Sequence, residues 1–252
     1  MFLTFKSLQS IPNLRHAVTT RDGGVSQREY SALNLAFHVG DDAKDVIENR
    51  KLLASSLEFD AKTLVCAQQV HGADSKVVTK KYAGRGALDW NSAILETDAL
   101  IVNEKQVPIL VLVADCAPIL IVDFKREILA VVHAGWRGAV AKIASQTISQ
   151  MIEYGTQVKD LQVGIGPCLC VDCFEIGEEV AAQIPQQCLI EGFKKPHLDL
   201  RALIQSDLLA KGVLPSCIET MNHCPKCDKE MFFSHRGKNG KTGRFGLVAW
   251  WE

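Results

Sequence analysis

The sequence predicts a mixed α+β fold. Short β-branched runs fill the middle of the chain, an amphipathic helical pattern follows them, and runs of strand type outnumber those of helix type. At 252 residues the chain has the length of one large domain, and no repeat, low-complexity block or Pro/Ser-rich linker divides it. We therefore expect a single domain over residues 1–252.

Composition and charge narrow the class of protein. The chain has 28 Lys+Arg against 29 Asp+Glu, so no overall basic field would attract nucleic acid or an anionic membrane, although a local anion site is possible. A secretion signal and an apolar run long enough to span a bilayer are both missing from the sequence. Nine cysteines without such a signal indicate reduced thiols, so we expect a cytoplasmic protein that binds neither membranes nor nucleic acid.

The N-terminal part of the chain predicts a loop and a helix. A pair of glycines two residues after Arg21 is typical of a tight loop, which would present this side chain. Asp41 or Asp42 can cap a surface helix that continues to Leu53.

A sheet is predicted between Thr63 and Val132. The β-branched runs are Leu64–Val70, Lys76–Thr79, Ala99–Val102, Ile109–Val113, Ile119–Phe124 and Ile128–Val132. The last three runs are apolar at successive positions, which is expected of central strands covered on both faces.

The second half of the chain predicts helices and closing strands. Apolar residues recur at helical spacing after Gly135, so one amphipathic helix is expected from there to near Gly155. The remaining predicted elements are helices at Gly177–Ile184 and Asp199–Lys211 and strands near Ile218 and at Phe245–Trp251.

Three potential metal ligands, His71, Cys116 and His133, each lie at the end of a predicted strand and next to a turn. Two imidazoles and one thiolate suit Zn²⁺, and three protein ligands leave a fourth position for water or substrate. The three residues are far apart in sequence, so the fold would have to assemble the site. From spacing alone, the alternative is a buried apolar cysteine and two hydrogen-bonded loop histidines.

Ordered motifs surround these ligands. They are Thr19-x-Arg21-x-Gly23-Gly24-Val25-Ser26, Leu33-Asn34-Leu35, His38-Val39-Gly40-Asp41-Asp42, His71-Gly72, Thr97-Asp98-Ala99-Leu100, Asp115-Cys116, His133-Ala134-Gly135-Trp136-Arg137-Gly138, Gly166-Pro167, Phe174-Glu175-Ile176-Gly177, Phe232-Phe233-Ser234 and Thr242-Gly243-Arg244. This set resembles the YfiH-like family, also described as the multicopper polyphenol oxidoreductase laccase-domain or purine nucleoside phosphorylase family. The resemblance covers nearly the whole chain, and the segment that begins at His133 is its most specific part.

The resemblance implies a cytosolic metal-dependent enzyme with a four-layer α/β/β/α sandwich of mixed β-sheets. It implies that His71, Cys116 and His133 bind zinc and take part in catalysis. The implied reactions are phosphorolysis of adenosine, inosine and methylthioadenosine to the base and a pentose 1-phosphate, and deamination of adenosine, so the partners are a nucleoside and phosphate. An older description implies copper and a laccase, and a related one implies quality control of peptidoglycan precursors.

Carboxylates and arginines complete the candidate site. Asp98 or Asp115 could move protons during deamination, or could instead orient the histidines from a turn. Arg21, Arg137 and Arg244 are candidates for phosphate binding, because a guanidinium contacts two phosphate oxygens at once. Arg137 is also expected at the start of a helix, where free N–H groups favour an anion. Each arginine could instead be a solvated surface charge.

Four further cysteines form two C-x-x-C pairs, Cys170/Cys173 and Cys224/Cys227. Paired C-x-x-C motifs are typical of structural zinc sites, but the interval between these pairs is longer than in the usual module. A redox pair at Cys224/Cys227 and ordinary thiols are the alternatives.

Other functional classes remain open from the residues themselves. A laccase needs several coppers held by many histidines, and seven histidines without a His-x-His pair do not favour it. Cys116 could act as a nucleophile with His133 or His71 as its base, in a hydrolase. A binding module without catalysis is the last alternative.

Overall fold

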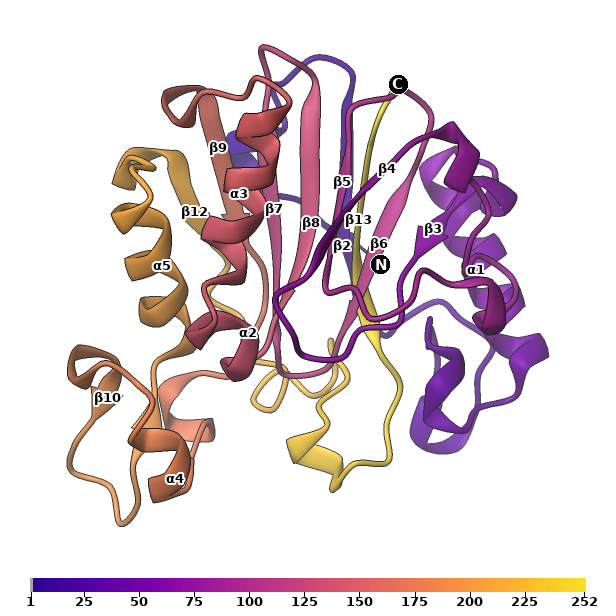
Figure 1. Cartoon of the computed structure of the whole chain (residues 1–252). Coiled ribbons are helices and arrows are strands. Elements are labelled where there is room, and N and C mark those ends of the chain that lie inside the picture. Colours follow the sequence, from indigo (N-terminus) through magenta and orange to yellow (C-terminus); the bar gives the residue numbers. More distant parts are fainter. Residues whose placement is uncertain (1) are drawn as a thin grey trace.

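Two β-sheets pack face to face in the computed structural model, which describes residues 2–252 (Figure 1). The larger sheet contains β12 (Ile218–Thr220), β9 (Leu161–Ile165), β7 (Ala117–Asp123), β8 (Ile128–Ala134), β5 (Ala99–Val102) and β4 (Ser75–Val78), in that order. The smaller sheet contains β1 (Phe2–Leu3), β2 (Leu14–Thr19), β13 (Phe245–Trp251), β6 (Ile109–Val113) and β3 (Val65–Cys66). Each sheet has parallel and antiparallel pairs, so the prediction of mixed sheets is confirmed.

Successive residues of the central strands face different layers. In β7, Ile119 packs toward the helices of the outer layer and Leu120 packs toward the smaller sheet. In β6, Val111 packs toward the larger sheet and Leu112 packs toward the opposite outer layer. Strands covered on both faces need apolar residues at every position, which explains the continuous apolar runs of the sequence.

Helices cover the outer faces of both sheets. On the larger sheet lie α2 (Trp136–Val140), α3 (Ile143–Glu153) and α5 (Leu200–Ala210), while α1 (Ala43–Leu57) covers the smaller one (Figure 1). The four-layer α/β/β/α sandwich is thereby confirmed. The short α4 (Glu178–Ala181) and the hairpin of β10 (Leu189–Ile190) and β11 (His197–Leu198) lie at one end. Within residues 2–252, none of the helices combines the length and the apolar character needed to cross a bilayer.

The prediction of one continuous helix after Gly135 is wrong. The backbone of Lys142 is left-handed, with φ of +60°, and this residue separates α2 from α3. A residue in the left-handed conformation interrupts helical hydrogen bonding, so two shorter helices replace the single amphipathic one.

Strand β9 was not predicted, although it occupies the interior of the larger sheet. Gln162 and Gly164 interrupt its apolar run, which hides the strand pattern. A Cβ at Gly164 would lie 2.6 Å from the ring of Phe5, so close packing of the aromatic ring requires glycine here.

One edge of the two sheets gathers several loops. Strands β7 and β8 are antiparallel, with Pro118 opposite His133, so the start of β7 and the end of β8 meet. The short connection from β6 to β7 crosses between the sheets at this edge. Phe245, the first residue of β13, pairs with Val113 at the end of β6 and brings the preceding residue, Arg244, to the same edge.

Candidate active site

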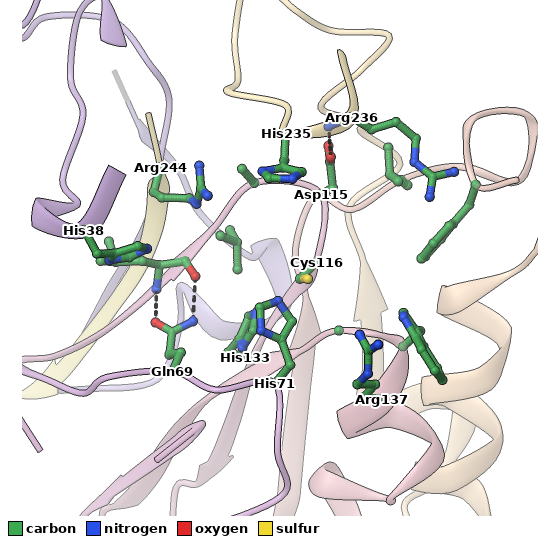
Figure 2. A pocket seen from close by; sticks show the side chains of 17 residues that line it. His38, Gln69, His71, Asp115, Cys116, His133, Arg137, His235, Arg236 and Arg244 are labelled. Carbon is green, nitrogen blue, oxygen red and sulfur yellow. Dashed lines mark hydrogen bonds between the residues drawn. The ribbon is translucent and has the colours of Figure 1, made fainter. Parts of the chain in front are cut away.

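The structure brings His71, Cys116 and His133 together at this edge. One ligand atom from each residue lies within 4.8 Å of the others, and Figure 2 shows the two rings and the sulfur facing one another. The centroids of the two imidazole rings are 4.7 Å apart. Gly135 permits this approach, because a Cβ there would lie 3.0 Å from His71 Cδ2 and 3.1 Å from the Cys116 sulfur.

The carboxylate of Asp98 holds His133 and the loop of His71 in place through hydrogen bonds. It is fully buried and accepts a hydrogen bond from His133 Nδ1 at 2.7 Å. It also accepts the backbone N–H groups of Val70, His71 and Gly72 at 3.2, 3.0 and 2.8 Å. With Nδ1 engaged, His133 directs Nε2 toward Cys116. Asp98 does not line the cavity in front of the ligands, so its place fits orientation of the histidines rather than contact with a substrate.

Electrostatic interactions among His71, Cys116 and His133, here called the trio, favour the thiolate form of Cys116. Burial would raise the pKa of Cys116, but the rings of His133 and His71 outweigh it and lower this pKa to about 6. Burial would lower the pKa of His133, but Cys116 and Asp98 outweigh it and raise that pKa to about 9. The thiolate is the form that binds metals. Two imidazoles and a thiolate with this spacing therefore fit a zinc ion, and they also fit copper.

A cavity of about 440 Å³ opens in front of the trio. Figure 2 shows Arg244 and His38 on one side of the trio and Arg137 on the other, with Asp115, His235 and Arg236 along a third side. Cavities of a few hundred Å³ are typical of small-molecule sites. Several guanidinium groups line this cavity, which favours the binding of an anionic substrate.

Two of the three arginines predicted to bind phosphate reach this cavity. The guanidinium of Arg244 donates to the carbonyl groups of Thr242 and Gly243, and that of Arg137 lies 4.4 Å from the ring centre of Trp136. Arg137 is the second residue of α2, so the prediction that it lies at the start of a helix is confirmed, but this helix has only 5 residues.

Arg21 lies elsewhere. Its guanidinium donates to the carbonyl groups of Ser31 and Lys229 and lies 4.9 Å from the ring centre of Phe233. The structure therefore does not bring Arg21 to the cavity of the trio. Its binding of phosphate stays a prediction.

Asp115 is the predicted carboxylate that does line the cavity. Its backbone is left-handed, with φ of +92°, a strained conformation that is frequent at functional sites. Oδ1 accepts the Ser234 hydroxyl at 2.7 Å and Oδ2 accepts the N–H of Arg236 at 2.6 Å. Asp115 thus fastens the loop that carries His235 and Arg236.

Sequence reasoning missed four polar residues of the cavity, His38, Gln69, His235 and Arg236. Gln69 is held by paired hydrogen bonds to the backbone of Leu112. Burial, together with nearby cationic groups, lowers the pKa of His38 to about 4, so its ring is neutral at pH 7. His38 lies in one of the family-like motifs, and this position could have identified it as a candidate site residue. His235 and Arg236 follow the last residue of another such motif.

Comparisons with known proteins find similar chains over nearly the whole length. The family model described as "Multi-copper polyphenol oxidoreductase laccase" matches residues 15–252. Adenosine deaminase RL5 from an unknown prokaryotic organism is 34% identical over 94% of this chain and 93% of its own length. Purine nucleoside phosphorylase YlmD of Geobacillus stearothermophilus is 37% identical over 90% of this chain and 86% of its own. The crystal structure of the hypothetical protein YfiH from Bacillus licheniformis has a TM-score of 0.94 at 28% identity, over 97% of this chain and 95% of that one.

Proposed function

The chain belongs to the multi-copper polyphenol oxidoreductase laccase family, in which YfiH-type proteins fall, and from this premise we propose that it is a zinc-dependent purine nucleoside phosphorylase that also deaminates adenosine. The observation that carries the proposal is a His/Cys/His ligand set at the base of a cavity lined by arginines. Relatives named purine nucleoside phosphorylase and adenosine deaminase support the two activities. The proposed substrates are adenosine, inosine and methylthioadenosine, with phosphate.

His71, Cys116 and His133 would hold the metal. When bound, zinc supplies a Lewis acid that polarises a substrate oxygen or lowers the pKa of a water molecule. Asp98 acts as a positioning residue, because its hydrogen bonds orient His133 and the loop of His71.

In phosphorolysis, a phosphate oxygen forms a bond to C1′ of the sugar while the bond from C1′ to the purine nitrogen breaks. The electron pair of that bond goes to the base, which takes up a proton. Arg137 and Arg244 are assigned to the phosphate, since they reach the cavity from opposite sides of the trio. Their positive charge would hold the phosphate in line with the sugar. It would also offset the repulsion between the phosphate and the departing base.

In deamination, water adds to C6 of the purine and ammonia leaves. This reaction needs a group that transfers a proton from the water to the leaving nitrogen. Asp115 is assigned that role, because its carboxylate lines the cavity and keeps lone pairs beyond its two hydrogen bonds.

Product analysis with and without phosphate tests the proposed function. Incubating the purified protein with adenosine and phosphate is expected to yield adenine and ribose 1-phosphate. Without phosphate, the expected products are inosine and ammonia. Adenine released at the same rate without phosphate would assign a hydrolase instead. Oxidation of a phenol by the copper-loaded protein, with no purine product, would favour the oxidase alternative.

Arg244→Gln is expected to raise the KM for phosphate about 10- to 100-fold, because a charge-assisted hydrogen bond contributes about 1.5–3 kcal/mol. Deamination does not use phosphate, so its rate is expected to change far less. Steady-state kinetics of both reactions check this split. Arg15→Gln is the control, since Arg15 pairs with Glu252 at the surface. Equal losses in both reactions would contradict a phosphate role. Arg21→Gln in the same assay tests the remaining prediction for that residue.

A further inference from the structure

A second cluster of potential metal ligands lies outside the cavity. The sulfur atoms of Cys170, Cys173, Cys224 and Cys227 all lie within 4.8 Å of one another. The Cys227 sulfur is 3.8 Å from that of Cys170 and 3.5 Å from that of Cys173. Four sulfurs arranged tetrahedrally at about 2.3 Å from a zinc ion would be about 3.8 Å apart. A disulfide would need about 2.0 Å, so the spacing matches ligation and not a covalent bond.

The topology explains why the two pairs meet. Strands β9 and β12 are parallel neighbours, with Val163 opposite Ile218. The chain therefore leaves both strands at the same edge of the sheet. Cys170 and Cys173 follow β9, and Cys224 and Cys227 follow β12, so the long interval in sequence corresponds to a short distance in the fold.

Hydrogen bonds hold the loop of the second cysteine pair in place. The N–H of Cys224 donates to Asp228 Oδ2 at 3.2 Å, and the N–H of Asp228 donates to the carbonyl of Cys224 at 2.8 Å. The same carboxylate oxygen accepts His223 Nδ1 at 2.9 Å. Partners of this kind fix the position of neighbouring ligands.

We propose that Cys170, Cys173, Cys224 and Cys227 form a structural Zn²⁺ site that is separate from the His71/Cys116/His133 site. Four protein thiolates complete a tetrahedral shell and leave no position for a substrate, which is the arrangement of structural rather than catalytic zinc. Of the described residues 2–252, those that line the cavity do not include these four cysteines.

The proposed zinc site lies where it would stabilise one wall of the cavity. The chain that leaves Cys227 continues to Ser234 and Arg236, whose hydroxyl and N–H bind Asp115. The guanidinium of Arg236 also donates to the carbonyl of Cys173. The zinc ion would therefore fasten the segment that supplies one side of the cavity to the loop after β9.

Metal analysis of the purified, reduced protein tests the proposal. The wild type is expected to carry two equivalents of zinc per chain. The double variant Cys173→Ser/Cys227→Ser is expected to lose one equivalent of zinc. It is expected to keep the other equivalent, which the substitution His71→Ala removes. Cys217→Ser serves as the control, because this thiol lies outside both clusters. A lower thermal midpoint is expected for the double variant.

Cobalt substitution keeps the test decisive if the double variant does not fold. His71→Ala loaded with Co²⁺ is expected to show the visible spectrum of a tetrathiolate complex. The proposal is overturned if the wild type binds a single equivalent that depends on His71, or if the cobalt spectrum lacks thiolate ligands. Isolation of a disulfide between the two pairs from the reduced protein would also overturn it.

Discussion

Cys116→Ser is expected to lower kcat/KM for phosphorolysis by about 10³-fold or more and to remove one equivalent of zinc. The sulfur of Cys116 lies within 4.8 Å of a nitrogen of each imidazole, and these rings lower the pKa of the thiol to about 6, in favour of the thiolate. A serine hydroxyl stays protonated under the same conditions and is a poor ligand for zinc. Loss of several kcal/mol of electrophilic stabilisation corresponds to about three powers of ten in rate. Kinetics and metal content measured on the same preparation check the result.

Chelation separates this role from that of a cysteine nucleophile. If Cys116 binds a metal, a chelator is expected to abolish the activity of the wild type, and added zinc to restore it. Activity that survives chelation but disappears in Cys116→Ser would indicate covalent catalysis by the thiolate, with His133 as its base. Cys217→Ser, at a half-buried thiol outside both metal clusters, is the control and is expected to keep its activity.

The sequence placed Cys116 and His133 beside readable strands, whereas their grouping with His71 as metal ligands depended on the resemblance to a family. Cys116 directly precedes β7 and His133 is the second-last residue of β8, and both strands contain continuous apolar runs. Antiparallel pairing of these strands then brings the two residues to one edge. For His71, the resemblance to a family supplied what spacing could not, since this residue lies in a loop with φ of +62°.

The rest of the cavity could not be predicted from local patterns. His38 lies in a short 3-10 helix and His235 in a loop, on different sides of the trio, and their positions depend on how those segments pack on the finished sandwich. Arg21 illustrates the reverse case. Its motif marked it as a phosphate ligand, yet carbonyl groups of neighbouring loops engage its guanidinium outside the cavity. Residue type and loop chemistry indicate what a side chain can bind, whereas tertiary packing decides what it faces.

The break at Lys142 has a similar origin. The helical spacing of apolar residues continues across Lys142, so the pattern predicts one helix. Lysine rarely adopts the left-handed conformation, so the residue type gives no sign of the break. The two C-x-x-C pairs show that a long interval in sequence does not exclude a common site when two parallel strands direct the chain to one edge.

Asp98→Asn is expected to weaken zinc binding about 10- to 100-fold and to lower the thermal midpoint by about 5 to 20 °C. The two carboxylate oxygens of Asp98 accept four donors. An amide keeps one oxygen and turns an NH₂ group toward the other pair, so about two buried donors lose their acceptor. Each unpaired donor costs about 1–3 kcal/mol, and 1 kcal/mol shifts the midpoint of a chain of this size by about 2–4 °C. Weaker orientation of His133 accounts for the loss of metal affinity.

Asp123→Asn separates the metal effect from a general effect of losing a buried carboxylate. Asp123 is fully buried at the far end of β7 and accepts the N–H groups of Lys125 and Arg126. This variant is expected to lower the thermal midpoint while zinc affinity, measured by competition with a chelator, stays at the wild-type value. Equal zinc affinities for the Asp98 and Asp123 variants would contradict a positioning role for Asp98. Retained affinity in Asp98→Asn would mean that packing alone orients the histidines, and the carboxylate would then serve only to anchor the loop of His71.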